Sequence, residues 1–201
     1  MNAPLIRVRE VRLYERPVRL RMPFRFGVVT LREAPQAFVH VRIEDGQGRS
    51  AWGASAELLA PKWFDKSLAL TNEQNFDQLR LALRLAADAY TQDQTPRTAF
   101  GHFAAHYAGQ IDAGADRGLN ALTANFGPAQ IDRAVLDALC RIEGTSFYEA
   151  VRANLPGIDP ALLPDQLGDL AGFAMPQFLA GLAPAGTVAA RHTVGLVDEI
   201  G

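Results

Sequence analysis

The sequence contains very few of the residues that usually build disulfide, zinc or lysine-based sites. Of its 201 residues only one is cysteine, Cys140, and only two are lysines, Lys62 and Lys66. A single cysteine excludes an internal disulfide and a thiolate zinc cluster. Because Cys140 lies in an amphipathic helical pattern, we interpret it as a packed residue and not as a nucleophile.

Long apolar runs and phosphate-binding loops are also missing from the sequence. No stretch reaches the roughly 18 apolar residues of a membrane span, and the N-terminus lacks the hydrophobic region of a signal peptide. Neither a Walker A loop nor a dinucleotide-binding glycine fingerprint is present. We therefore expect a cytoplasmic protein with no membrane partner.

The charge balance gives no reason to expect a polyanionic partner. The formal net charge is −2, which argues against nucleic acid binding. Eight arginines fall within the first 32 residues. Most of them alternate with apolar residues, so we interpret them as the solvated face of a strand. The 48% hydrophobic content is enough for a buried core.

An antiparallel meander is predicted for the first 57 residues. From Val18 to Phe26, apolar residues alternate with arginine and proline, a period of two that predicts a strand with one buried face. Pro23 has no N–H, so this strand should lie at a sheet edge. Further strands are expected at residues 6–14, 37–44 and 50–53, with a turn at 44–49.

Helical periodicity begins after the meander. Thr71-x-x-Gln74 resembles a capping box and predicts the start of the first helix. A third helix should begin near Gly127-Pro128, and Ser146-x-x-Glu149 should cap a short fourth helix. The predicted buried stripes are Phe76, Leu79, Leu83, Ala86, Ala87 and Tyr90 in the first helix, Phe100, Phe103, Ala104, Tyr107 and Ile111 in the second, and Ile131, Val135, Leu139 and Ile142 in the third.

Two short motifs resemble catalytic or metal-binding patterns only in part. Gly53 to Glu57 is close to the Gly-x-Ser-x-Gly nucleophile elbow, but its last position is glutamate and not the glycine that the tight turn requires. His102 and His106 lie one helical turn apart without an evident third ligand, so we interpret them as a structural or surface pair. The loop residues Trp63 and Phe64 either staple the loop to the core or contact a ligand.

Three segments together resemble the N-terminal capping domain of the enolase superfamily, in its mandelate racemase and muconate lactonizing enzyme branch. They are Met22 to Gly27, the hairpin ending in Trp52-Gly53, and the helix Ile131 to Leu139. The resemblance covers roughly residues 5 to 155. It implies an α+β fold in which a three-stranded antiparallel meander packs on a helical bundle, followed by a connector and the first strand of a truncated TIM barrel.

The resemblance divides the chain into a capping domain at residues 1–155, a connector at 156–190 and a first barrel strand at 191–201. In such enzymes, a Mg2+ ion held by three carboxylates at barrel strand ends stabilises the enediolate that forms when a lysine or histidine removes the proton α to a carboxylate. Neither lysine lies in the barrel portion, and His192 lies outside the position of the base. We therefore assign no catalytic or metal-binding residue to this chain and expect it to be inactive alone.

The expected function is to supply the substrate-specificity portion of a racemase, dehydratase or cycloisomerase acting on a small-molecule carboxylate. Loops at 22–31 and 54–66 would close over the barrel mouth, with Phe24, Phe26, Ser55 and Trp63 as the expected substrate-binding residues. Homo-oligomerisation of the full-length enzyme stays open. The alternative is a stand-alone α+β binding or interaction module without catalysis.

Overall fold

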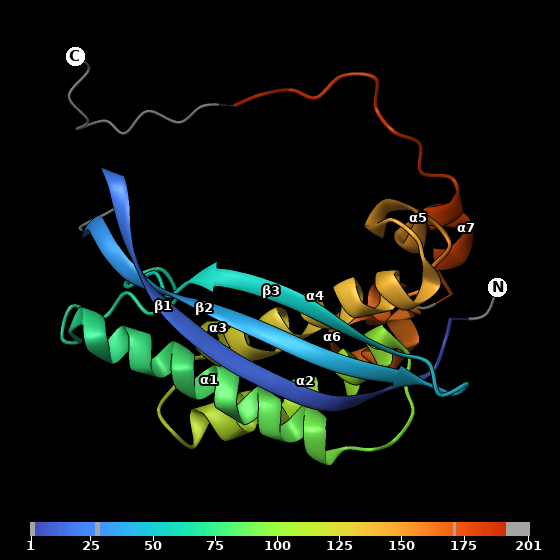
Figure 1. Ribbon diagram of the computed structural model, residues 1–201, viewed down its shortest axis with the longest axis horizontal. Coiled ribbons are helices and arrows are strands. Elements are labelled where there is room, and N and C mark those ends of the chain that lie inside the picture. Colours follow the sequence, from blue (N-terminus) through green and yellow to red (C-terminus); the bar gives the residue numbers. More distant parts are fainter. Residues whose placement is uncertain (1–2, 27–28, 171, 192–201) are drawn as a thin grey trace.

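Three antiparallel strands form a single sheet in the order β1-β2-β3 (Figure 1). The structure is a computed structural model and describes residues 3–26, 29–170 and 172–191. The strands are β1 (Ile6–Phe26), β2 (Val29–Asp45) and β3 (Ser50–Leu58). The predicted meander is confirmed, and β1 and β3 are its two edges.

The N-terminal strand differs from the prediction in length. Residues 6–14 and 18–26 belong to one continuous strand, because Glu15, Arg16 and Pro17 continue the pairing with β2. Pro17 is tolerated there because an edge strand has one side that needs no hydrogen-bond donor. Pro23 lies at the same edge, as predicted, within an irregularity where the register moves from Arg19↔Glu33 to Phe24↔Leu31.

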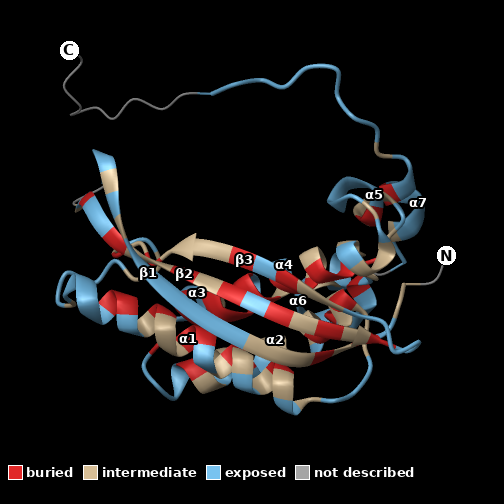
Figure 2. Cartoon of the chain, viewed as in Figure 1, coloured by how far each residue is buried: buried red, intermediate tan, exposed pale blue. Residues whose placement is uncertain are grey.

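Two long helices cover one face of the sheet. They are α1 (Asn72–Gln92) and α4 (Phe126–Glu143), and both contact the strands directly. Buried residues line the interface between sheet and helices (Figure 2). The predicted stripes of these helices are confirmed: Phe76, Leu79, Leu83, Ala86, Tyr90, Ile131, Val135 and Leu139 are buried, and Ala87 and Ile142 are partly buried.

Glycine sets the closest approaches between these layers. A Cβ atom at Gly53 of β3 would overlap the backbone of Ala134 and Ala138 in α4. A Cβ atom at Gly127 would overlap the carbonyl group of Ala82 in α1. The two glycines therefore let α4 pack tightly against both β3 and α1.

The second helix, α2 (Ala99–Ala115), buries a different face from the predicted one. Its buried residues are Ala99, His102, Gln110 and Gly114, whereas Phe100, Phe103, Ala104, Tyr107 and Ile111 are only partly buried. The aromatic-stripe prediction was wrong because α2 packs on α1 and α4 through small residues and hydrogen-bonding groups. The Gln110 amide, for example, donates to the carbonyl oxygens of Ala82 and Ala124.

The remaining helices are short. They are α3 (Ala121–Ala124) between the long helices, then α5 (Phe147–Arg152), α6 (Pro164–Leu167) and α7 (Met175–Ala180), with 3-10 turns at Pro160–Leu162 and Gly168–Leu170. The predicted barrel strand at 191–201 lies outside the described residues apart from Arg191. The domain boundaries at 155 and 190 stay predictions.

The other face of the sheet carries arginine and aromatic side chains and is not covered by the helices (Figure 1). The guanidinium of Arg12 lies 4.6 Å from the ring centroid of Trp52, and that of Arg16 lies 5.1 Å from the ring of Phe38. His40 is exposed and packs edge-on against Tyr14. The N-terminal arginines thus form a solvated strand face. Within the described ranges, no helix is both long and apolar enough to cross a membrane.

Candidate functional site at the arm of the sheet

One end of the sheet extends beyond the helices as an arm. We define the arm as residues 18–26 of β1 with residues 29–34 of β2 (Figure 1). The predicted buried face of 18–26 is not buried in this chain: Val18, Leu20 and Phe26 are partly exposed, and Met22 and Phe24 are 72% and 56% exposed. No described helix lies over this part of the sheet, so the alternating apolar residues face solvent.

Three of the predicted substrate-binding residues meet at the arm. The rings of Phe24 and Phe26 lie 5.5 Å apart between centroids. Trp63, from the loop between β3 and α1, packs edge-on against Phe26 at 5.3 Å. We call Phe24, Phe26 and Trp63 the aromatic cluster. It joins the two loops that the sequence predicted to act together.

The loop that carries Trp63 is held by hydrogen bonds to its own backbone and to α1. The Lys62 ammonium donates to the carbonyl oxygens of Ser67, at 2.7 Å, and Leu70. Asp65 accepts from the Gln78 amide at 3.0 Å and from the Ser67 N–H at 2.9 Å, and these bonds lower the pKa of Asp65. These hydrogen bonds fix the loop, and its two aromatic residues lie in different environments.

Phe64 turns into the core, whereas Trp63 turns toward the arm. The Phe64 ring packs edge-on against Phe126 of α4 at 5.1 Å. Trp63 is 55% exposed. Phe64 thus staples the loop to the core, whereas more than half of the Trp63 side chain is exposed.

Ser55, the fourth predicted substrate-binding residue, is not part of the aromatic cluster. It lies on β3 against α4, is buried, and its hydroxyl donates to the Gln130 carbonyl oxygen at 2.7 Å. It also lines a separate cavity of about 480 Å3 that includes Arg133 and Asp137. Its hydroxyl hydrogen is committed to Gln130, so only its lone pairs are left for a ligand.

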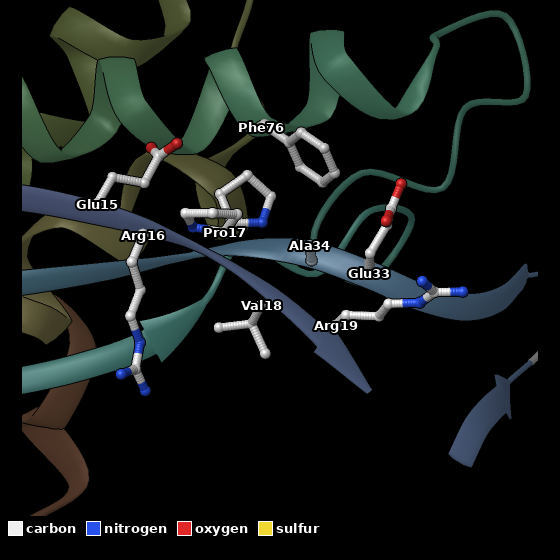
Figure 3. Close-up of a pocket in the computed structure, with 9 residues that line it drawn as sticks. Glu15, Arg16, Pro17, Val18, Arg19, Glu33, Ala34 and Phe76 are labelled. Carbon is white, nitrogen blue, oxygen red and sulfur yellow. The ribbon is translucent and has the colours of Figure 1, made fainter. Parts of the chain in front are cut away.

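A cavity of about 600 Å3 lies at the base of the arm (Figure 3). Its apolar lining includes Pro17, Ala34 and Phe76, and its charged lining consists of Glu15, Arg16, Arg19 and Glu33. In Figure 3, Glu15 points toward α1 and Arg16 points to the opposite side of the strand. The cavity therefore offers an apolar surface bordered by charges of both signs.

The charged side chains around this cavity differ in whether they form ion pairs. Glu15 accepts two hydrogen bonds from Arg80 of α1, at 2.8 and 2.7 Å, which lower the pKa of Glu15. Arg19 forms no ion pair among the described residues. Its guanidinium is thus a cation at the base of the arm that could receive an anionic ligand group. The alternating sequence pattern predicts Arg19 only as a solvated strand residue and gives no sign that it lines a cavity.

The histidine pair is structural. His102 is fully buried, its Nε2 lies 2.9 Å from the Ile6 carbonyl oxygen, and burial lowers the pKa of His102. His106 stacks on Tyr90 with 4.3 Å between centroids. Burial also raises the pKa of the Cys140 thiol, which disfavours the reactive thiolate. In the described part of the chain, no three His, Cys, Asp or Glu side chains gather into a cluster able to hold a metal.

Comparison with known proteins gives a structural similarity but no match to a family model. No family model matches the chain, and no curated protein matches it. Among solved structures, it is similar to the crystal structure of an enolase from alpha pretobacterium bal199 with bound Mg, at 14% sequence identity and a TM-score of 0.46. The match covers 72% of this chain and 34% of that one, so the chain spans about a third of its length.

Proposed function

We propose that this chain is the capping, substrate-specificity portion of an enolase-superfamily enzyme that acts on small carboxylates. The proposal is supported by the order of the resembling segments in the sequence. It is carried by one geometric observation, the edge-on packing of Phe26 against Trp63 at 5.3 Å. This contact joins the arm to the loop after β3, the two segments that would close over a reaction centre.

In this proposal the aromatic cluster forms an apolar wall over the distal part of the substrate. Phe24 and Trp63 keep more than half of their surface free, so both rings can be covered by a ligand or by the rest of an enzyme. Covering them would exclude water from the reacting end of the substrate. Ser55 would accept a hydrogen bond through its lone pairs. Within that superfamily, we propose the branch of mandelate racemase and muconate lactonizing enzyme.

The reaction chemistry belongs to residues outside this chain. Mg2+, when bound in such an enzyme, would stabilise the charge that develops as the proton α to the carboxylate is removed. The described residues do not fit a magnesium site, since they offer no cluster of three carboxylates. We therefore derive no catalytic step from this chain. Its residues would orient the substrate and exclude water.

The first experiment separates recognition from chemistry by changing Trp63. In the enzyme encoded by the complete reading frame, Trp63→Ala should lower kcat/KM for the native acid by about tenfold or more, because the distal contact is lost. Mg2+ affinity should not change. Leu68→Ala is the matched control, because Leu68 lies in the same loop, is 74% exposed and takes no part in the aromatic cluster. Unchanged kinetics in Trp63→Ala would remove the loop from the site.

A stand-alone binding module is the second candidate, and the cavity at the base of the arm favours it. Its volume of about 600 Å3 suits a small ligand, and Arg19 offers a cation there. Titrating the 201-residue chain with Mg2+ and with a panel of acid sugars separates the two candidates. The capping proposal predicts neither Mg2+ binding nor turnover. Tight binding of an acid by the chain alone, weakened by Arg19→Gln, would support the module.

A further inference from the structure

A partly buried carboxyl group lies far from the arm, among the helices. Asp132 of α4 accepts a hydrogen bond at its Oδ1 from the hydroxyl of Tyr90, a fully buried residue of α1, at 2.9 Å. Burial raises the pKa of Asp132 to about 7, and the Tyr90 hydrogen bond lowers it only in part. Above neutral pH the fold therefore holds a negative charge with a single hydrogen-bond donor.

No cation of the described residues balances this charge. None of the ion pairs formed by arginine or histidine side chains includes Asp132. Its Oδ2 atom accepts no hydrogen bond within the same described part of the chain. A partly desolvated carboxylate without a counter-ion is costly, so a cation that reaches it gains more than it would at the surface.

Asp132 lines a cavity of about 200 Å3 between α2, α4 and α5. Among the described residues that line the cavity, Asp132 alone carries a charge. Three phenylalanines contribute rings to the lining, Phe100 and Phe103 from α2 and Phe147 from α5, and the first two lie 5.8 Å apart between centroids. The cavity is separate from the aromatic cluster, since α5 lies at the end of the molecule opposite the arm (Figure 1). It adjoins the cavity lined by Ser55, with which it shares Leu136 and Phe147.

Aromatic rings around a carboxylate are the combination that recognises organic cations. The ring faces attract the positive charge, and the carboxylate pairs with it. The size also fits, since an apolar cavity of about 150 Å3 holds benzene. We propose that this cavity binds a small organic ammonium ion, with its nitrogen at Asp132 and its hydrocarbon part among the phenylalanine rings.

The alternative is that Asp132 and Tyr90 form a hydrogen-bonded pair that only stabilises the helices. The two interpretations differ in charge dependence. Asp132→Asn keeps the size and the Oδ1 acceptor for Tyr90, but it removes the negative charge. A packing role tolerates this change, whereas ammonium recognition does not.

Benzylamine is the probe, with benzyl alcohol as its neutral counterpart. Each is titrated into the 201-residue chain at pH 8.5 and followed by NMR of the phenylalanine ring signals. Wild type should bind benzylamine at least tenfold more tightly than Asp132→Asn, and both proteins should bind benzyl alcohol equally. Asp112→Asn, an exposed position on α2, is the matched charge control and should behave as wild type.

A second variant keeps the proposal testable if Asp132→Asn folds poorly. Phe103 is partly exposed, so Phe103→Leu should fold while removing one ring from the cavity. It should weaken benzylamine binding severalfold. The proposal would be overturned if wild type showed no binding at millimolar benzylamine. It would also be overturned if Asp132→Asn or Phe103→Leu folded and bound benzylamine as tightly as wild type does.

Discussion

Residues 37–43 and residues 18–26 have the same alternating pattern but opposite environments. In the body of the sheet, Ala37, Val39, Val41 and Ile43 are all at most 4% exposed. In the arm, the corresponding apolar residues are partly or largely exposed (Figure 2). Periodicity thus predicted a strand in both places, but it did not predict which strand face would be covered.

The difference arises from where the helices end. Phe76, near the start of α1, reaches only the base of the arm, where it lines the cavity with Pro17 and Val18. Beyond that point the described helices offer the arm no partner. An apolar strand face without a partner is typical of a surface that another segment or molecule covers. The arm is therefore the part to which the proposed function refers. The rest of the sheet with α1 and α4, which we call the body, is where we expect most of the stability.

The largest expected effect comes from breaking the contact between the sheet and α4. Gly53→Ala should lower the free energy of unfolding by about 3 kcal/mol or more, because the new methyl group overlaps the α4 backbone at Ala134 and Ala138. Chemical denaturation measures this. Gly109→Ala is the control, since Gly109 lies in α2 with open space around it, and it should be neutral or slightly stabilising. Equal stability of both variants would contradict the tight packing.

A matched pair of truncations compares the body with the arm directly. Val41→Ala should cost about 2 kcal/mol, because it leaves a cavity in the core. Met22→Ala should change the free energy of unfolding by less than about 0.5 kcal/mol, because Met22 is exposed. Urea denaturation of both variants tests the comparison. A large cost for Met22→Ala would show that the arm is packed in solution.

The pH dependence of the free energy of unfolding should arise partly from Asp132. Its pKa is raised from 3.8 to about 7, so its protonated form is favoured in the fold. The stability it contributes is fully present below pH 4 and is lost as the pH rises toward 7 and above. Asp132→Asn should therefore be more stable than wild type by about 1–2 kcal/mol at pH 8.5, with a smaller difference at pH 5. Thermal unfolding at both pH values measures this; a difference independent of pH would contradict it.

A smaller loss than that of Val41→Ala is expected at the start of α1. Thr71 accepts from the Gln74 N–H, and the Gln74 side chain accepts from the Thr71 N–H in return. Thr71→Ala should cost about 1 kcal/mol in the free energy of unfolding. Thr71→Ser should retain most of the stability that the cap provides, because serine keeps the hydroxyl acceptor. Equal losses in both variants would show that the methyl group, and not the cap, matters.

The sequence predicted where helices begin better than it predicted which of their faces are buried. The capping box at Thr71, the start of α4 at Gly127-Pro128 and the cap at Ser146 are local patterns, and the structure confirms them. The α2 stripe was wrong, because helical periodicity cannot tell which of two moderately apolar faces meets the neighbouring helices. His102 and Gln110 are buried there through hydrogen bonds to distant carbonyl groups.

The candidate site could be predicted only in part for the same reason. Phe24, Phe26 and Trp63 were expected to act together, and the structure brings them into contact. Ser55 was expected to join them, but β3 places it against Gln130. The cavities lined by Arg19 and Asp132 were not predicted. A single charged residue in an alternating or helical pattern does not indicate which distant segments surround it.

By itself, the sequence determined the local elements, because capping residues, proline positions and apolar periodicity act within a few residues along the chain. Only the tertiary structure decided which apolar faces are covered, how closely Gly53 and Gly127 let α4 approach, and that Asp132 lines a cavity ringed by phenylalanines. Those properties depend on which segments distant in the sequence meet. Burial and the pKa of a buried group follow from that meeting and not from local sequence.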